Sequence, residues 1–414
     1  MPAATSVRWT DRRPGGLPVD SIAFDPDDFR PRLSTRLLVL QPTPFCNIRC
    51  DYCYLPDRDD KSRMTPETAR RAAQRLADDG LLGDRLTVIW HAGEPLAMPI
   101  GFYDEAITAM GKALGPHCTV THALQTNAML VDADWCRLFL RHGVRVGVSI
   151  DGPAFLHDAH RVTRRGHGTH ARTMKGIEQL REHGLPFHAI AVATAQTLPH
   201  VEAFADFFES LGVTELGCNF DEAEGGHARS SVEGREVAHR AFLGRLFERV
   251  AASGGRLQVR ERTQALRRLA GTSPPVSWRG VAQPDNAQVR PFAIVNVAWN
   301  GDFGSFSPEL LGFTAPGHGS FTLGNVMDTG FVDSTRREPF KRLWAAIRRG
   351  TEACRQTCTH FDFCGGGAPV NKLCENGDLA SAETLYCRSM VQRPIDLVLA
   401  QAEASASSPT QREA

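Results

Sequence analysis

Three cysteines stand close together near the start of the chain, in the segment CNIRCDYCY, with the spacing Cys46-x3-Cys50-x2-Cys53. Three thiolates on one short loop can bind three irons of a 4Fe–4S cube, which leaves the fourth iron without a protein ligand. A small molecule can coordinate such an open iron, whereas a fully ligated cluster only transfers electrons. The alternatives are a zinc site or buried thiols, but zinc usually takes four ligands in paired spacing, and no fourth Cys or His stands nearby.

The chain has 11 cysteines in 414 residues, and five of them lie between residues 354 and 387. The N-terminal residues contain no apolar stretch typical of a signal peptide, so we expect a cytoplasmic protein. In a large chain without an export signal, cysteines are more often metal ligands or buried thiols than disulfides. The second group of cysteines therefore also indicates metal binding.

Strand-like and helix-like segments alternate from residue 36 to residue 220, which predicts a parallel sheet with helices on its outer face. About six such units are fewer than the eight of a closed barrel, so the fold class is α/β with an open, partial (β/α)6 barrel. The strands are predicted at 36–42, 85–90, 118–124, 144–150, 187–194 and 213–220. The helices are predicted at 65–80, 101–114, 132–143, 170–184 and 200–212. The cysteine triad follows the first strand, at the end where such barrels place their chemistry.

The remaining segments suggest a chain of several parts around this barrel. We expect an N-terminal arm at 1–33, the barrel at 34–220, a helical insertion or linker at 221–280 with two helices in 231–270, a smaller second domain at 281–400 and a disordered tail at 401–414. Within the second domain, residues 293–310 predict a hairpin with Asn300-Gly301 at its turn. A further helix is predicted near 338–349.

The charge and hydropathy of the chain indicate no nucleic-acid or membrane partner. Lys plus Arg and Asp plus Glu both number 47, so the formal net charge is zero. No stretch approaches 18 consecutive apolar residues.

The cysteine triad, with Tyr52 before its last member, resembles the signature of the radical S-adenosylmethionine (SAM) superfamily. Three further motifs follow successive strands as they do in that superfamily: HAGEP (91–95), QTNA (125–128) and SIDGP (149–153). The resemblance implies that Cys46, Cys50 and Cys53 hold a 4Fe–4S cluster with one open iron. It implies that SAM binds beside the cluster, and the residues that it indicates for this are Tyr52, Gly93, Glu94, Asn127, Ser149 and Arg161.

The second cysteine group resembles the SPASM extension of radical SAM enzymes that modify peptides, but in reduced form. Ala368 stands where the family's glycine run ends in cysteine, and the 293–310 hairpin has none, so the resemblance implies one auxiliary 4Fe–4S cluster instead of two. Its implied ligands are Cys354, Cys358, Cys364 and Cys387. Cys374 is the alternative to Cys387 as the fourth ligand. The isolated Cys118, Cys136 and Cys218 are interpreted as core residues.

Within this family, the chain is most similar to peptide maturases of glycine-rich repeat precursors, which join an aromatic ring to a β-carbon in a cyclophane crosslink. The matching segments are QPTPFCNIRCDYCYLPDR, WHAGEPLAMP, FSPELLG and FCGGGAPVNKL. The resemblance implies a glycine-rich precursor peptide as substrate and an electron donor such as a flavodoxin or ferredoxin. Candidates for the base that removes a proton are Asp151 and Glu309, with Asp221 and Glu222 as further possibilities by position. The alternatives are a sulfatase-maturing enzyme that makes formylglycine and a non-catalytic iron–sulfur redox sensor.

Overall fold

The computed structural model describes residues 24–213, 215–225, 227–271 and 274–407. Its centre is a ten-stranded sheet with the order β10-β9-β8-β6-β5-β4-β2-β13-β14-β17. Six neighbouring strands of this sheet are parallel and confirm the predicted partial barrel. They are β2 (Thr35–Leu40), β4 (Leu82–Trp90), β5 (Thr119–Thr126), β6 (Arg145–Ser149), β8 (Phe187–Ala193) and β9 (Glu215–Phe220).

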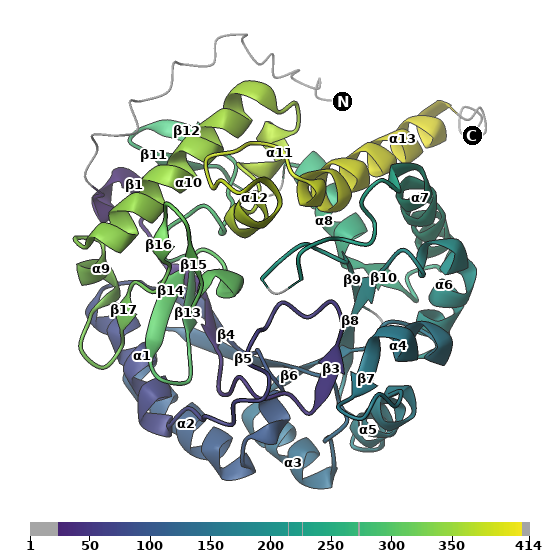
Figure 1. Ribbon diagram of the computed structural model, residues 1–414, viewed down its shortest axis with the longest axis horizontal. Coiled ribbons are helices and arrows are strands. Elements are labelled where there is room, and N and C mark those ends of the chain that lie inside the picture. Colours follow the sequence, from purple (N-terminus) through teal and green to yellow (C-terminus); the bar gives the residue numbers. More distant parts are fainter. Residues whose placement is uncertain (1–23, 214, 226, 272–273, 408–414) are drawn as a thin grey trace, which may run out of the picture.

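Helices cover the outer face of this curved sheet, as Figure 1 shows. They are α1 (Pro66–Asp78), α2 (Ile100–Leu114), α3 (Ala133–His142), α4 (Ala154–His160), α5 (His170–Glu182) and α6 (Val201–Ser210). In α1, the Thr65 side chain accepts a hydrogen bond from the Thr68 N–H and Pro66 occupies the first turn. The face of α1 toward the sheet carries Ala72 and Leu76, both fully buried. Burial of such apolar faces supplies most of the stability of a helix in a protein.

The segment after β9 contains the two predicted helices, α7 (Glu236–Ala252) and α8 (Arg260–Leu269). Between them, the short strand β10 (Gln258–Val259) continues the parallel sheet beside β9. Strands β11 (Val276–Trp278) and β12 (Val281–Gln283) then form a small antiparallel sheet with β1 (Phe29–Arg30).

The predicted hairpin is formed by β13 (Ile294–Val297) and β14 (Asp302–Ser305), and Gly301 has a left-handed φ of 91° at its turn. β13 pairs in parallel with β2 and β14 pairs with β17 (Gly324–Asn325), so this region extends the barrel sheet itself. Strands β15 (Thr314–Ala315) and β16 (Gly319–Ser320) form a separate pair. The helices that follow are α9 (Phe331–Ser334), α10 (Glu338–Thr357), α11 (Phe361–Cys364), α12 (Pro369–Asn376), the π-helical turn η6 (Cys387–Gln392) and α13 (Arg393–Ser407).

Part of the expected N-terminal arm and part of the expected C-terminal tail belong to the folded structure, which the sequence did not predict. Of the expected arm, residues 1–23 lie outside the described residues, but Phe29 is only 3% exposed and its ring lies tilted against that of Trp344, with the centroids 6.0 Å apart. The expectation of a disordered tail is wrong for 401–407, because α13 continues to Ser407. The Ala, Gln and Glu residues there are strong helix formers and extend a helix that is already packed.

Candidate active site

The loop with the N-terminal cysteines lies on the inner side of the barrel, held there by a small antiparallel sheet that the sequence did not predict. β3 (Ile48–Cys50) pairs with β7 (Arg161–Thr163), so that Cys50 is directly opposite Arg161. Cys46, Cys53 and Tyr52 pack with the buried Ile48, Cys50 and Met129 in a small cluster separate from the main core. The three thiols therefore share one apolar environment, which fits an iron–sulfur cluster.

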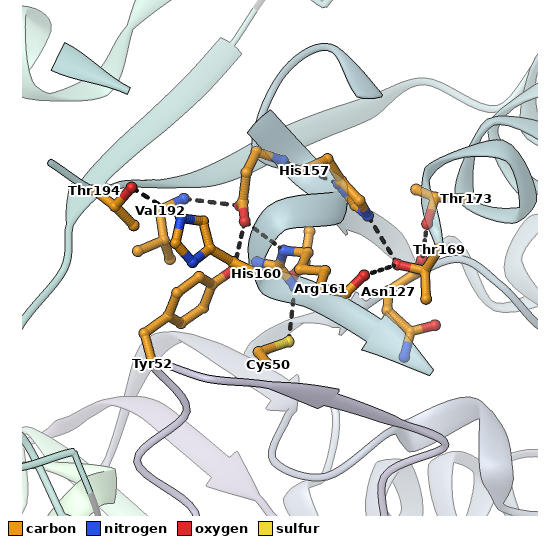
Figure 2. Close-up of polar contacts among 12 residues, drawn as sticks. Cys50, Tyr52, Asn127, His157, His160, Arg161, Thr169, Thr173, Val192 and Thr194 are labelled. Atoms are coloured by element: carbon orange, nitrogen blue, oxygen red, sulfur yellow. Dashed lines mark hydrogen bonds and ion pairs between the residues drawn. The ribbon is translucent and has the colours of Figure 1, made fainter. Parts of the chain in front are cut away.

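A buried ion pair fixes the position of Arg161. Its Nε donates a hydrogen bond to Asp151 Oδ2 at 2.9 Å, and its guanidinium also approaches Cys50 Sγ at 3.8 Å (Figure 2). Tyr52 Oη donates to the same Asp151 oxygen at 2.5 Å, and the Val192 N–H donates to the other at 3.0 Å. Despite burial, the charge of Arg161 holds the pKa of Asp151 below its usual value. Both carboxylate oxygens of Asp151, which was named as a base candidate, therefore already accept hydrogen bonds within this arrangement.

The same apolar environment affects the thiols themselves. Burial raises the pKa of Cys46 to about 12 and that of Cys50 to about 11. Thiolate is the form that binds iron, so cluster binding must release these protons.

The HAGEP turn approaches the cysteine loop so closely that its third residue must be glycine. Gly93 has a φ of 59°, and a Cβ there would lie 2.4 Å from the Thr43 carbonyl oxygen and 2.5 Å from that of Phe45. The next residue, Glu94, donates its backbone N–H to Phe45 O at 2.7 Å. Its buried carboxylate accepts hydrogen bonds from Leu96 N–H, Thr126 Oγ1 and Asn127 N–H at 2.7–2.9 Å. The carboxylate of Glu94 thus joins the HAGEP and QTNA motifs.

The other two predicted SAM-binding residues extend this arrangement. Asn127 Nδ2 donates to Asn47 Oδ1 at 2.7 Å, which links the end of β5 to the cysteine loop. Ser149 Oγ accepts from Gln125 Nε2 at 2.7 Å. The structure therefore brings Gly93, Glu94 and Asn127 to the cysteine loop. Their roles in binding SAM remain predictions.

The four predicted auxiliary ligands converge on one cavity. Cys354, Cys358, Cys364 and Cys387 all contribute to its lining, together with Gly366 and Gly367. The run Gly365–Gly367 has three consecutive left-handed residues, and a Cβ at Gly367 would lie 3.3 Å from Cys387 Sγ. Glycine thus allows the chain to pass beside the thiols.

A hydrogen-bond donor stands at each of these four sulfurs. Lys372 Nζ lies 3.2 Å from Cys354 Sγ, and the Gly367 N–H lies 3.2 Å from Cys364 Sγ. Thr384 Oγ1 lies 3.2 Å from Cys387 Sγ, and Gln392 Nε2 lies 3.9 Å from Cys358 Sγ. Donors of this kind are typical around iron–sulfur clusters.

The remaining cysteines lie elsewhere. Cys374 does not line this cavity: its thiol accepts a hydrogen bond from the Gly225 backbone, and the Glu309 side chain is also nearby. This placement favours Cys387 as the fourth ligand. Ala368 is buried, and Cys118, Cys136 and Cys218 are buried in the main core.

Three half-buried glutamates, Glu222, Glu224 and Glu309, line a cavity of about 300 Å³ between the barrel and α12. Asn371 Nδ2 donates to Glu222 Oε2 at 2.9 Å and to Glu224 Oε1 at 3.3 Å. Burial raises the pKa of all three, that of Glu222 to about 7, and neighbouring carboxylates add to the effect at Glu222 and Glu224. The glutamate cavity can therefore accept a proton near neutral pH. Asp221, also named as a candidate, instead pairs with His227 at 2.7 Å.

This glutamate cavity is close to the N-terminal cysteine loop. Gly225 lies against Tyr54, since a Cβ at Gly225 would be 2.4 Å from the Tyr54 carbonyl oxygen. Tyr54 Oη is buried and has no hydrogen-bond partner among the described residues, and its raised pKa reflects burial first and then the charges of Glu309, Cys53 and Glu224.

Within the described ranges, no three His, Cys, Asp or Glu side chains are grouped so that they could hold a single metal ion. A cube spreads its thiolates over several irons, so its ligands stand farther apart than those of one ion. No helix in the described part of the chain is long and apolar enough to cross a membrane.

Sequence reasoning missed several residues of these sites. Glu224, Asn371, Lys372, Thr384 and Gln392 were not predicted. Asn371 and Lys372 belong to the segment FCGGGAPVNKL, whose likeness to the family was the available signal. Gln392 contacts Cys358 only through the tertiary fold, whereas Thr384 stands three residues before Cys387 and contacts its thiol locally.

Comparison with known proteins agrees with this geometry. Residues 40–208 match the model of the radical SAM superfamily. An uncharacterized protein of Synechocystis sp. is 38% identical over 377 residues, which cover 90% of this chain and 93% of the relative. A serine-type anaerobic sulfatase-maturating enzyme of Bacteroides thetaiotaomicron is 28% identical, with 84% and 85% of the two chains covered.

Two solved structures have the same fold. Native anSMEcpe with bound AdoMet matches with a TM-score of 0.71 at 20% identity, over 89% of this chain and 99% of that one. SuiB of Streptococcus suis bound to its precursor peptide SuiA matches with a TM-score of 0.61 at 16% identity, over 86% and 76%. Through residues 40–208, which match its family model, the chain contains a radical SAM superfamily domain.

Proposed function

We propose that this protein is a radical SAM maturase that forms an aromatic-to-Cβ crosslink of the cyclophane type in a glycine-rich precursor peptide. The observation that carries the proposal is the position of the glutamate cavity, which adjoins Tyr54 on the N-terminal cysteine loop and Asn371 next to the auxiliary cysteines. A crosslinking reaction needs a radical source, a base and an electron acceptor. This arrangement offers residues for each of the three.

The N-terminal cysteines would hold the cluster with the open iron, and Gly93, Glu94, Asn127, Ser149 and Arg161 would position SAM. When bound, these cofactors supply reductive cleavage of SAM to methionine and a 5′-deoxyadenosyl radical. The chain's own part is to hold one target hydrogen close to that radical and to keep water away. The buried surroundings of Cys46 and Cys50 suit this exclusion.

Ring closure removes two hydrogens from the peptide. One leaves as an atom with deoxyadenosine, and the other leaves as a proton and an electron. We assign the proton to the glutamates, with Glu309 and Glu222 as the base candidates, because they are half-buried carboxylates with raised pKa values. Asp151 is the weaker candidate, because its oxygens already accept from Arg161, Tyr52 and Val192. An auxiliary cluster held by Cys354, Cys358, Cys364 and Cys387 would supply the electron acceptor.

The second candidate is a sulfatase-maturing activity, in which a Cys or Ser of the substrate would be oxidised to formylglycine. The similarity to the Bacteroides thetaiotaomicron enzyme over 84% of this chain favours it. The missing cysteines at 368 and in the 293–310 hairpin favour the crosslinking activity instead. A non-catalytic redox sensor would not need the Gly93–Glu94 turn so close to the cysteine loop.

The decisive experiment is coexpression of the protein with a glycine-rich precursor, followed by tandem mass spectrometry. We expect a product about two hydrogen masses lighter, with no atom added and with an aromatic residue joined to a β-carbon. Conversion of Cys or Ser to an aldehyde would establish the sulfatase-maturing alternative. Absence of SAM cleavage by the reconstituted protein would refute both enzymes.

A further inference from the structure

Lys372 of α12 is buried beside the auxiliary cysteines, with only 2% of its surface exposed. Its Nζ lies 2.8 Å from the Gly350 carbonyl oxygen and 3.2 Å from Cys354 Sγ. Lysine is almost never fully buried in proteins unless its charge is paired. The surroundings of Lys372 therefore should contain a negative charge.

No such charge comes from a carboxylate. In the part of the chain that the structure describes, Lys372 Nζ forms its contacts with Gly350 and Cys354 and has no Asp or Glu partner. An uncompensated buried ammonium costs several kcal/mol. The compensating charge must therefore come from the thiol side of Lys372, where the cavity of the four cysteines lies.

The backbone around Lys372 is shaped to admit this side chain. Gly350 lies inside α10, and a Cβ there would be 2.2 Å from Leu379 O and 3.1 Å from Lys372 Nζ. On the other side, a Cβ at Gly367 would be 3.5 Å from Lys372 Cε. Gly350 thus leaves room for the lysine to reach Cys354, and a Cβ at Gly367 would lie at ordinary van der Waals distance from it.

Lys372 also differs in kind from the other donors at these thiols. The donors at Cys358, Cys364 and Cys387 are an amide side chain, a backbone N–H and a hydroxyl, and all of them are neutral. A cube with four thiolate ligands carries net negative charge, and its reduction adds one more. A cation in contact with a ligand sulfur favours the reduced form, since net charge and hydrogen bonds to sulfur set the potential.

We propose that Lys372 is the counter-cation of the auxiliary cluster, a positioning residue that raises the reduction potential of the cluster and so makes it a better electron acceptor. This inference rests on the auxiliary cluster of the proposed function, but it does not depend on which bond is formed in the peptide.

The test uses the full chain with Cys46, Cys50 and Cys53 all changed to Ala, so that only the auxiliary cluster contributes to the signal. In this background, Lys372→Met removes both charge and donor, and Lys372→Gln keeps an N–H donor without the charge. Lys341→Met is the control, because Lys341 also lies on a helix of this region but is 55% exposed. The midpoint potential is measured by redox titration of the reconstituted proteins with spectroscopic detection.

We expect the midpoint potential to fall in Lys372→Gln and further in Lys372→Met, and to stay unchanged in Lys341→Met. An unchanged potential in an iron-loaded Lys372→Met or Lys372→Gln protein would overturn the proposal. If the parent triple variant binds no iron, the assignment of an auxiliary cluster is wrong. This outcome distinguishes failure of the cluster assignment from failure of the role proposed for Lys372.

Chemical unfolding of the iron-free proteins gives a second readout that does not require cluster loading. Without a cluster, the buried charge is uncompensated, so Lys372→Met should stabilise the iron-free protein. With the cluster bound, the same change should destabilise it. A merely structural lysine that only bonds Gly350 O would give destabilisation in both states, and that result would also overturn the proposal.

Discussion

The Tyr52 hydroxyl lies 2.5 Å from Asp151 Oδ2, the oxygen that also accepts the Arg161 Nε–H at 2.9 Å. Tyr52 stands between two cysteines of the N-terminal triad, whereas Asp151 follows β6. One carboxylate oxygen therefore connects the cysteine loop, the end of a barrel strand and β7. This connection gives the cysteine loop a fixed position although it has little regular structure of its own.

Asp151→Asn should destabilise the protein by about 3–5 kcal/mol, because it leaves the buried Arg161 charge without its partner. Tyr52→Phe removes a single hydrogen bond to a charged group and should cost about 1.5–3 kcal/mol. Denaturant unfolding of the iron-free proteins measures both. Asp134→Asn is the control, since its ion pair with Arg137 is solvent-exposed and should contribute little. Equal stabilities of Asp151→Asn and the control would contradict the role given to this ion pair.

Iron content should separate the two cysteines that compete for the fourth auxiliary position. Reconstituted wild-type protein should carry about eight irons, and the triple Cys46, Cys50, Cys53 to Ala variant about four. Cys387→Ala should reduce the auxiliary iron, whereas Cys374→Ala should leave it intact, because Cys374 lies beside Gly225 instead of the cavity. Iron analysis with Mössbauer spectroscopy checks the count. Loss of iron in Cys374→Ala but not in Cys387→Ala would reverse the assignment.

The three cysteines at 46–53 should each be required for SAM cleavage, because all three thiolates hold the cube. Single Ala variants should produce no 5′-deoxyadenosine above background in a dithionite-reduced assay. Cys136→Ala is the matched control, because Cys136 is a fully buried core residue of α3 far from both cysteine groups in the sequence. Undiminished deoxyadenosine from any triad variant would refute the cluster assignment.

Gly93→Ala should be far more harmful than Gly143→Ala, although both glycines have left-handed φ values of 59° and 60°. A Cβ at Gly143 meets no atom within 4 Å, so that change costs only the backbone strain of about 1–2 kcal/mol. At Gly93 the new Cβ would collide with two backbone carbonyl oxygens of the cysteine loop, which adds about 1–3 kcal/mol and displaces the loop. Thermal unfolding and SAM-binding calorimetry test this. Similar effects of the two substitutions would show that close approach at Gly93 is not required.

Crosslinking under single-turnover conditions should accelerate as pH rises through about 7, because ionised Glu222 accepts the proton. Glu222→Gln and Glu309→Gln should still form deoxyadenosine but release less crosslinked peptide. Glu338→Gln, at an exposed site on α10, is the control. Equal loss of deoxyadenosine and crosslink in the Glu222 and Glu309 variants would argue against a base role.

The same carboxyl gives a stability test with a defined sign. Because the pKa of Glu222 in the folded protein is raised from 4.5 to about 7, the folded state keeps the proton of this carboxyl up to a higher pH than the unfolded state does. The free energy of unfolding should therefore fall as pH rises from about 4.5 to about 7. Glu222→Gln should make this fall smaller, as measured by urea unfolding across that range.

The barrel could be predicted from the sequence because its pattern is local. Each strand is a short apolar run, each helix has an apolar face, and side-chain caps at Thr65 and Asp132 mark the starts of α1 and α3. The strand-end motifs were recognisable for the same reason. The placement of Cys387 beside Cys354, by contrast, depends on how α10, α12 and η6 pack together.

The relationships that could not be predicted join segments distant in the sequence. No local pattern indicates that β3 pairs with β7, or that Lys372 reaches Cys354 past Gly350. In the tail, by contrast, the local pattern was misleading. Its small polar residues suggested disorder, but α13 is packed at its start and continues as a helix to Ser407.

The parallel pairing of β2 with β13, in which Leu37 lies opposite Ile294, has a consequence for synthesis of the protein. During translation the first barrel strand emerges early, but one of its two edges has no partner until residue 297 has left the ribosome. An unpaired apolar strand edge is prone to associate with other chains, and pairing across so long a separation is slow. Chains that end near residue 280 should therefore aggregate even though they contain all six barrel strands, and the nascent protein should depend on chaperones until its hairpin is made.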